Sequence, residues 1–494
     1  MKSSCFPNKM DRFWVLHLAV VLLLASCAVG PDFHSPKTPL PAAWSSLSAG
    51  APDQTSVTTP QPADLVAWWK VFNDPLLTSL VERAFASNLD LRQAKARIRQ
   101  ARATRGIAAS GLWPEIDANA SYDRSLNSSA SFGSSGTSLQ STALRSAREL
   151  FQVGLDASWE LDLFGGVRRN IEAAQADYQA AVEDWHGVRV SLAAEVGINY
   201  VALRGFQQQI LIARQNLAMQ RHTAEITGKR FAAGFASGLD AANANALVAT
   251  TESQVPLLES SAQAAIFGLS VLLGLEPAAL AQELASDKAI PTTPPEVPVG
   301  LPSDLIRRRP DIRSAEARLH ASTARIGAAT ADLFPKFSLT GSAGYLSSDI
   351  SSLANFSSRY WSYGVGMYWP IFTAGRIRWN IELQKAFREE DLAAYEQTIL
   401  TALKDVETAL VAYAKDQQRI SSLAVAVENN RKAVDLSTRL YVVGKSDFLN
   451  VLVAERALNT SEDALVQSTR SMATNLIALY KALGGGWEME TPVN

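Results

Sequence analysis

The chain has 494 residues, of which 47% are hydrophobic and 19% are charged, and its formal net charge is −2. This balance lacks the basic character of a nucleic-acid-binding protein and excludes that class of partner. The five histidines are scattered, and no pair has the HxxxH spacing of a metal site. No nucleophile–base set and no glycine-rich phosphate loop is recognisable, so we expect neither an enzyme nor a cofactor nor a bound metal.

Residues 1–26 have the pattern of an export signal. Basic residues precede an apolar run from Phe13 to Ala25, which at about 12 residues is too short to span a bilayer as a helix. Small residues then lead up to Cys27. A plain signal peptide with an incidental cysteine is one interpretation; we favour a bacterial lipoprotein signal, in which Cys27 becomes the lipidated first residue. Cys5 lies in the removed segment, so no disulfide is available to the mature chain.

Residues 27–65 form a polar segment rich in proline, which we expect to be an extended strap between the lipid anchor and the body. Proline fixes the backbone and lacks an N–H, which excludes a regular helix and a central strand. A second proline-rich segment, residues 291–302, predicts a linker between two repeats, residues 66–290 and 303–484. Residues 485–494 form a C-terminal tail.

In each repeat a helix leads into two strands. Apolar and polar residues alternate along the strands with a period of two, and each run has about 10 residues, the length that a tilted strand needs to cross a bilayer. We expect the helices over Pro75–Leu112 and Pro310–Leu333, and the strands over about 114–124, 150–163, 335–346 and 361–372.

A soluble, half-buried sheet would show the same alternation. Here, however, the polar faces carry acids in a row, as a water-filled lumen would, and aromatic residues gather at strand ends as in membrane-interface girdles. Four strands cannot close a barrel, and an open edge in lipid leaves backbone groups unsatisfied, so copies of the chain must pool their strands. Two copies would give eight strands and a filled bore, and three would give twelve and a wider one. The aromatic residues are Trp113, Tyr122, Trp159, Tyr345, Trp361, Tyr363 and Trp369.

Each repeat continues into a long helix hairpin. Gly166–Phe231 and Arg376–Tyr441 contain no proline, and a helix of that length would be roughly 100 Å long. A 3,4 spacing places apolar residues at eleven of fifteen positions in the first run and twelve of fifteen in the second, which indicates a coiled coil. A purely structural coiled-coil protein would not need the four strands. Shorter helices return from about Ser237 to Leu273 and from about Asp447 to Leu483.

The hairpin tips are residues 231–240 and 441–450. Each has a glycine suited to the left-handed position that ends a helix, followed by a residue suited to the N-cap of the returning helix. In the first tip Ser237 and Asp240 also fit a capping box, with Asp in place of the usual Glu or Gln. The glycines are Gly234 and Gly444, and the N-cap residues are Ser237 and Asp447.

The two repeats are related by an internal duplication. Asp90–Pro114 aligns with Asp311–Pro335 without gaps, and ten of 25 positions are identical. The distance in sequence between equivalent residues of the two repeats is 221 residues in this segment and falls to 210 residues further along. A serine-rich stretch, Ser125–Ser146, lies where the offset changes, and surface loops absorb such length differences. The later identical pairs include Trp159/Trp369, Gly165/Gly375, Gly234/Gly444, Leu239/Leu449 and Gly274/Gly484.

Several short segments, taken together and in this order along the chain, are specific enough to indicate a protein family. They are Cys27–Phe33 (CAVGPDF), Arg309–Glu316 (RPDIRSAE), Ile326-Gly327, Phe334-Pro335, Arg439–Gly444 (RLYVVG) and Leu479–Trp487 (LYKALGGGW). With these segments the chain resembles the outer-membrane efflux protein family, the TolC-like ducts, and within it the OprM-like lipoprotein branch. They span almost the whole mature chain.

The resemblance implies a fold that is mainly α with a transmembrane β-barrel portion. Three protomers would form a twelve-stranded barrel in the outer membrane of a Gram-negative bacterium, continued by a long helical barrel in the periplasm. The loops at Ser125–Ser146 and Leu346–Tyr360 would face outside, and strap, linker and tail would form a belt. The homotrimer would meet a periplasmic adaptor and an inner-membrane pump, of the RND type, and conduct small molecules passively. A conduit for type I polypeptide secretion is the alternative.

The resemblance also implies two sites at the tips. Similar ducts have an acid at the place of Asp240 and close the pore with acids after the second glycine, but here those later places are Asn450 and Val453. Leu449 matches the hydrophobic constriction of the OprM-like branch. We therefore expect a periplasmic gate that depends on Leu449, with Asp240 as a lesser contributor. Adaptors dock at these tips in the family, which gives Gly234, Ser237, Gly444, Lys445 and Asp447 as expected contacts.

Overall fold

The computed structural model describes residues 28–46, 57–61, 65–126 and 147–488. Cys27, the signal segment and most of the serine-rich loop lie outside these residues. The chain forms two compact units. Unit 1 comprises the chain to Ser35, Gln100–Gln179 and Ala317–Ala393, and unit 2 comprises Pro36–Arg99, Ala180–Glu316 and Ala394–Asn494.

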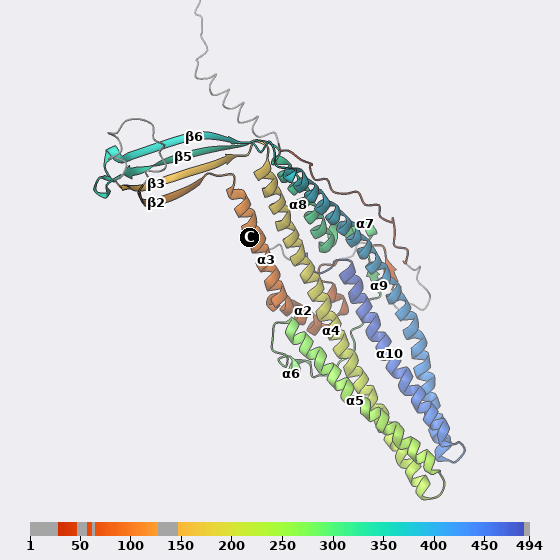
Figure 1. The fold of residues 1–494 in the computed structure, drawn as a ribbon. Helices are drawn as coiled ribbons and strands as arrows, with labels where there is room; N and C mark the ends of the chain where they lie inside the picture. The colour runs from red at the N-terminus through yellow and green to blue at the C-terminus, as the bar shows by residue number, and fades with distance from the viewer. Residues whose placement is uncertain (1–27, 47–56, 62–64, 127–146, 489–494) are drawn as a thin grey trace, which may run out of the picture. The chain divides into compact units, whose positions relative to one another are not determined.

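Unit 1 contains a four-stranded antiparallel sheet with the order β2-β3-β5-β6 (Figure 1). The first two strands come from the first repeat and the last two from the second, so the sheet joins the repeats through the β3–β5 pair. Among the described residues, β2 and β6 each pair with one strand only and form the two edges. The strands are β2 (Glu115–Ser125), β3 (Arg148–Leu161), β5 (Lys336–Ser347) and β6 (Arg359–Tyr368).

The register gives this sheet one polar face and one apolar face, as the period of two predicts. Successive rows across the four strands point to opposite sides, and both faces are largely exposed in a single chain. Large apolar side chains lie on the apolar face, such as Tyr363 at 83% exposure and Val365 at 74% exposure. One polar row is Asp117, Asp156, Ser342 and Ser362, and the adjacent row on the other face is Ile116, Ala157, Gly341 and Tyr363.

Strand β6 ends earlier than the alternation predicts. The alternation extends the strand to about residue 372, with Trp369 and Ile371 on its apolar face, whereas β6 ends at Tyr368. Pro370 has no N–H to donate to a neighbouring strand, which ends the pairing here. The Trp369 side chain turns instead to a backbone carbonyl of the preceding helix–strand junction.

The duplication is confirmed by equivalent hydrogen bonds. Trp369 Nε1 donates to the Leu333 carbonyl over 3.1 Å, and its counterpart Trp159 Nε1 donates to the Leu112 carbonyl over 3.0 Å. Equivalent glycines also share the left-handed backbone conformation, with φ of 78° and 84° at Gly165 and Gly375, 78° and 73° at Gly234 and Gly444, and 69° and 76° at Gly274 and Gly484.

The expected single helix from Pro75 to Leu112 is wrong. The structure has two helices, α2 (Pro75–Ser87) and α3 (Leu89–Ser110), separated by Asn88. Asn88 has an extended backbone with ψ of 134°. Its side chain accepts from the Leu91 N–H over 3.0 Å and donates to the Leu272 carbonyl over 2.9 Å. A tertiary contact together with local capping therefore fixes the break. In the second repeat, α7 (Pro302–Arg308) and α8 (Pro310–Ala331) flank Arg309.

The helix hairpins agree closely with the predicted runs. The coiled-coil seam is confirmed as well, because every predicted seam residue of the second long helix is buried or partly buried. Of the fifteen predicted seam residues of the first long helix, only Phe231, at the tip, is exposed. The helices are α4 (Gly166–Ala232), α5 (Gly238–Leu272), α9 (Arg376–Val442) and α10 (Phe448–Ala482).

The two proline-rich segments contact each other in unit 2. Strand β1 (Val57–Thr59) pairs in parallel with β4 (Glu296–Pro298) in a small two-stranded sheet. The indole of Trp44 donates to the Gly300 carbonyl over 3.0 Å. Strap and linker are thus held together, while residues 28–46 form no regular helix or strand. The remaining short elements are η1 (Trp68–Phe72), α6 (Ala281–Leu284), η4 (Ile350–Ser352) and η5 (Phe356–Ser358).

The first described residues of the chain are held firmly to unit 1, and we call this contact the N-terminal clasp. It consists of Val29, Asp32, Phe164, Arg169 and Glu172. Val29 N donates to the Phe164 carbonyl over 3.1 Å. Arg169, only 5% exposed, lies 2.7 Å from Asp32 and 2.8 Å from Glu172, and its Nε donates to the Val29 carbonyl over 3.3 Å. The Arg169 guanidinium lowers the pKa of Asp32.

Candidate functional site

Both hairpin tips belong to unit 2, and both long helices end in the same way. At the first tip, Gly234 N donates to the Phe231 carbonyl over 2.9 Å and Phe235 N donates to the Arg230 carbonyl over 2.8 Å. This pair of bonds is a Schellman motif, which requires the left-handed conformation that glycine adopts without strain. The second tip repeats it, with Gly444 N on the Tyr441 carbonyl at 3.0 Å and Lys445 N on the Leu440 carbonyl at 2.8 Å.

The N-caps of the returning helices differ between the tips. Ser237 and Asp240 form the predicted capping box, since Asp240 N donates to Ser237 Oγ over 3.1 Å and Ser237 N donates to Asp240 Oδ2 over 3.0 Å. Asp447 takes the N-cap position of α10, but among the described residues its side chain accepts no cap hydrogen bond. Asn450 donates instead to Ser446 Oγ over 3.0 Å. The Asp240 carboxylate is therefore engaged within its own tip.

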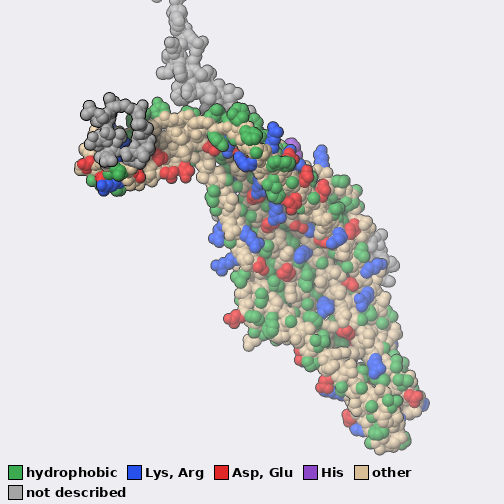
Figure 2. Space-filling model, viewed as in Figure 1, with side chains coloured by type: hydrophobic (Ala, Val, Ile, Leu, Met, Phe, Trp, Pro, Cys, Tyr) green, Lys and Arg blue, Asp and Glu red, His purple; other side chains and the backbone are tan. Residues whose placement is uncertain are grey.

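The predicted gate residues of the second copy lie on one face of α10. Leu449 and Val453 are 61% and 59% exposed, and Asn450 is exposed beside them. Their neighbours Val451 and Leu452 point the other way and are 0% and 3% exposed. Hydrophobic side chains are visible on the surface of the tips (Figure 2). The structure thus brings Leu449, Asn450 and Val453 together and leaves them free of the core of a single chain.

The predicted adaptor contacts occupy the turns themselves. Gly234, Ser237, Gly444, Lys445 and Asp447 are all exposed. A Cβ added at Gly234 would meet nothing within 4 Å among the described atoms. The tips are therefore accessible in a single chain, as a docking surface needs to be.

Arg230 joins the two tips, although the sequence did not single it out. Its Nη1 donates to the carbonyls of Tyr441 and Val442 over 3.0 Å and 3.1 Å, and its guanidinium carbon lies 4.7 Å from the centre of the Tyr441 ring. These carbonyls are at the C-terminus of α9, where partial negative charge accumulates. Beneath them lies a buried cluster of Ala244, Leu247, Tyr441, Phe448, Val451 and Leu452.

Arg230 is the last member of a polar seam along α4, which we define as Gln209, Asn216, Thr223 and Arg230. They recur every seven residues, so they share one side of the helix, and the first three are 7%, 4% and 3% exposed. Their spacing is the signal that could have revealed them. The partners on α10 are Asp463 for Gln209 at 2.5 Å, Glu462 for Asn216 at 3.0 Å and Glu455 for Thr223 at 2.8 Å.

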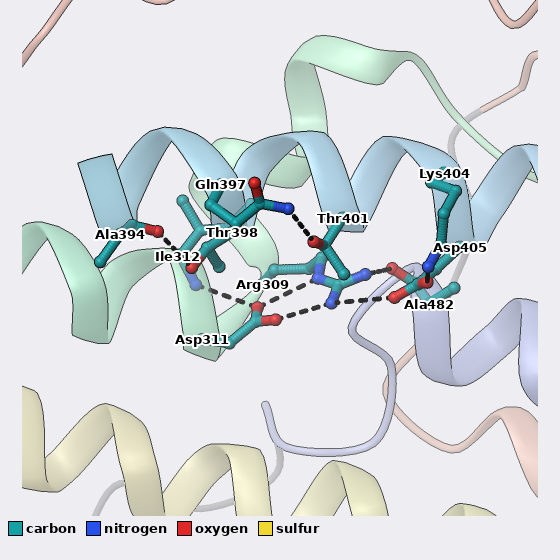
Figure 3. Close-up of polar contacts among 10 residues, drawn as sticks. All are labelled: Arg309, Asp311, Ile312, Ala394, Gln397, Thr398, Thr401, Lys404, Asp405 and Ala482. Carbon is teal, nitrogen blue, oxygen red and sulfur yellow. Dashed lines mark hydrogen bonds and ion pairs between the residues drawn. The ribbon is translucent and has the colours of Figure 1, made fainter. Parts of the chain in front are cut away.

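A second polar cluster surrounds Arg309, which is 9% exposed (Figure 3). Its Nε and Nη2 reach both carboxylate oxygens of Asp311 at 3.0 Å and 2.6 Å, and Nη1 donates to the Ala482 carbonyl over 2.9 Å. Asp405 of α9 lies 3.7 Å from Nη2. Arg309 therefore connects the start of α8 with the C-terminus of α10.

The RPDIR segment and the residue before it, Arg308, meet the LGGGW segment at this place, although Arg308 and Trp487 are 179 residues apart in sequence. Trp487 Nε1 donates to the Arg308 carbonyl over 3.1 Å. The guanidinium of Arg313 lies 5.2 Å from the Trp487 ring centre, and the His186 ring lies 4.4 Å from it. Two segments that carried the family resemblance are thus one structural contact in unit 2. Among the described residues, no group of three or more His, Cys, Asp and Glu is placed to hold a metal ion.

Comparison with known proteins gives consistent matches over nearly the whole chain. Residues 80–275 and 301–485 match the family model described as outer membrane efflux protein. The chain is 36% identical to the pyoverdine export outer membrane protein OpmQ of Pseudomonas aeruginosa, over 96% of this chain and 97% of the relative. It is 33% identical to nodulation protein T of Rhizobium leguminosarum bv. trifolii, over 94% and 96%. The solved outer-membrane channel OprN is similar with a TM-score of 0.84 at 38% identity, covering 93% of this chain and 100% of that one.

Proposed function

This chain belongs to the outer membrane efflux protein family, and we propose that it is the exit duct of a tripartite efflux pump. It resides in the outer membrane of a Gram-negative bacterium and conducts small molecules passively to the exterior. A periplasmic adaptor and an inner-membrane pump, of the RND type, deliver the compounds. The duct itself performs no chemical step, because its part is to provide a continuous water-filled path.

The observation that carries the proposal is the four-stranded sheet, whose two edge strands, β2 and β6, are each paired on one side only among the described residues. Its apolar face suits lipid and its polar face suits a lumen. The unpaired backbone groups of β2 and β6 are incompatible with lipid unless another strand covers them. Pairing β2 of one copy with β6 of the next satisfies both edges. Three copies give twelve strands, which leaves a bore wider than the filled interior of an eight-stranded barrel.

The periplasmic end of the duct is formed by the tips. The exposed face of α10 with Leu449, Asn450 and Val453 supplies the constriction, and Leu449 provides most of its apolar packing. Asp240 contributes less, because its carboxylate is engaged in the capping box. The turn residues of both tips contact the adaptor. Cys27 carries the lipid anchor, and the N-terminal clasp holds the segment that follows it.

Deletion of the gene, followed by a broad susceptibility panel and complementation, tests the proposed function. We expect the deletion strain to become sensitive to several small compounds and the cloned gene to restore resistance. Unchanged susceptibility to every compound, with secretion of a polypeptide lost instead, would contradict small-molecule efflux and support the type I secretion conduit.

The tip as adaptor site is tested by Gly444→Pro. Proline fixes φ near −65°, which excludes the observed left-handed conformation, so the turn must change while the buried cluster beneath it remains. We expect loss of efflux with normal amounts of assembled protein in the outer membrane. Gly187, which has open space around it, is the site of a matched control, Gly187→Ala. Normal resistance in the Gly444→Pro strain would count against docking at this turn.

A further inference from the structure

Glu455 is the most buried of the α10 carboxylates that contact the polar seam. It lies on α10, is 2% exposed, and faces Thr223 of α4, which is 3% exposed. Oε1 of Glu455 lies 2.8 Å from Thr223 Oγ1. Among the described residues, neutral Thr223 is the hydrogen-bond partner of this carboxyl group, and no cation pairs with it. A buried carboxylate in such a place is costly, because its desolvation is not compensated by a cation or by further donors.

The neighbours of Thr223 indicate which form of Glu455 fits this place. Thr223 Oγ1 also lies 3.2 Å from the Met219 carbonyl oxygen, one turn earlier. A hydroxyl has one proton, so Thr223 cannot donate both to Met219 and to an ionised Glu455. If Glu455 is protonated, it donates to Thr223 Oγ1, and Thr223 donates to Met219. The protonated carboxyl thus satisfies both contacts at once.

Three arginines on the packed helices have other partners. Arg431 of α9 pairs with Glu462 at 2.7 Å, and Arg439 of α9 pairs with Asp435 at 2.9 Å. Arg230 of α4 donates to the carbonyls at the end of α9. His222 of α4 lines the adjoining groove between α4 and α9.

The net effect of the surroundings is to raise the pKa of Glu455. Burial raises the pKa of Glu455 by more than a hydrogen bond donated by Thr223 to the ionised carboxylate would lower it. Among the described residues, no charged side chain adds to these two causes.

We propose that Glu455 is a proton-linked latch between α4 and α10, protonated while the two helices are packed at the tip and ionised once they separate. The inference rests on the proposed function, in which the tips form the periplasmic end of the duct. It adds that separation of α4 and α10 opens this end and releases a proton to the periplasm. Raised pH therefore favours the open duct, and acid favours the closed one.

The direction follows from linkage. The packed state holds Glu455 at a raised pKa, and the separated state returns it to the ordinary value near about 4.3. Below the ordinary value the contribution of Glu455 to the packed state is fully present. As pH rises from the ordinary value through the raised one, this contribution declines by up to about tenfold per pH unit and per chain, and above the raised value it declines no further. Three copies in one duct would steepen this dependence.

The experiment measures open probability of the purified full-length protein in planar bilayers while the periplasmic side is titrated from about pH 5 to about pH 8. We expect wild type to open increasingly as pH rises. Glu455→Gln replaces the carboxyl by an amide of similar shape that stays neutral, and should keep the low open probability at every pH.

Two control variants separate Glu455 from other titrating groups. Glu428→Gln removes an exposed acid of α9 that pairs with Lys432 at 2.6 Å, and His222→Gln removes the imidazole in the neighbouring groove. Both should retain the wild-type pH dependence. If pores conduct but Glu455→Gln has the wild-type profile, or if His222→Gln abolishes the pH dependence, the latch is contradicted.

A second readout keeps the latch testable if no pore conducts, an outcome that would overturn the proposed function itself. Thermal unfolding of wild type and Glu455→Gln is compared across the same pH range. A latch predicts that Glu455→Gln gains stability over wild type as pH rises, because only wild type must bury an ionising group. A difference in Tm that stays constant with pH would overturn the latch.

Discussion

The change Arg230→Met tests whether one side chain holds the two tips of a chain together. Methionine keeps an unbranched stem of similar bulk and removes the guanidinium. The variant loses the hydrogen bonds from Nη1 to the Tyr441 and Val442 carbonyls at 3.0 Å and 3.1 Å, and the contact with the Tyr441 ring at 4.7 Å. The Tyr441 carbonyl then keeps the Gly444 N–H at 3.0 Å, and the Val442 carbonyl has to bind water in place of Arg230.

The size of the effect follows from the burial of each contact. The bond to Tyr441 is partly buried, and a hydrogen bond to a charged group contributes about 1.5–3 kcal/mol. The bond to Val442 is exposed and adds little, while the cation–π contact adds about 0.5–1 kcal/mol. The tip contact therefore loses about 2–4 kcal/mol. At 1.4 kcal/mol per tenfold, the ratio of joined to separated tips falls by roughly 30-fold to 1,000-fold.

Single-channel recording in planar bilayers measures this ratio as open probability. We expect Arg230→Met to open far more often than wild type. Arg221→Met is the matched control, since Arg221 lies on the same helix and pairs with Glu252 at 2.8 Å on an exposed surface, where ion pairs contribute little. Equal open probability in wild type and Arg230→Met, with Arg221→Met also unchanged, would refute the assigned role of Arg230.

The other predictions concern the constriction, the anchor and the helix ends. Leu449→Ala should raise the conductance in planar bilayers, because it removes apolar bulk from the exposed face of α10, and an unaltered current would contradict the constriction. Cys27→Ser should abolish metabolic lipid labelling while assembly persists, because the N-terminal clasp and the strands do not depend on the lipid; continued labelling would exclude Cys27. Gly274→Ala should lower Tm more than Gly234→Ala, since its Cβ would lie 2.7 Å from the Ser87 carbonyl oxygen whereas that of Gly234 meets open space, and both share a left-handed penalty of about 1–2 kcal/mol. Equal losses of Tm would refute the steric part.

The long helices and the duplication could be predicted because their signals are local and repeated. A 3,4 apolar spacing held over fifteen positions determines which side of α9 is buried, whatever the helix packs against. The positions of Gly234 and Gly444 fix the helix ends by backbone conformation alone. These features required no knowledge of the tertiary fold, which explains why they agree with the structure within a residue or two.

The break at Asn88 could not be predicted with the same reasoning. Its neighbours favour helix, and the extended backbone is stabilised in part by a bond to the Leu272 carbonyl, a residue far away in sequence. The pairing of β1 with β4 is equally non-local, because neither three-residue strand has a pattern of its own. Such features are determined by contacts between segments that lie far apart in the sequence.

The candidate site was predicted only in part. Leu449, Asn450 and Val453 could be placed together by helix geometry, and the capping box at Ser237 was found from its sequence spacing. Arg230 and Glu455 were missed because a seam search counts apolar residues and treats polar ones as interruptions. The seven-residue recurrence of Gln209, Asn216 and Thr223 shows that polar residues beside the apolar seam formed a pattern of their own.

The central claim is that the edges β2 and β6 of neighbouring copies pair, so that three chains close one barrel. The most direct test is the native mass of the particle extracted from outer membranes in mild detergent. We expect three chains in each particle, and an Ile116→Pro variant, which removes an N–H within the edge strand β2, should reduce their number. A stable particle of one or two chains, with the ability to conduct, would contradict the claim.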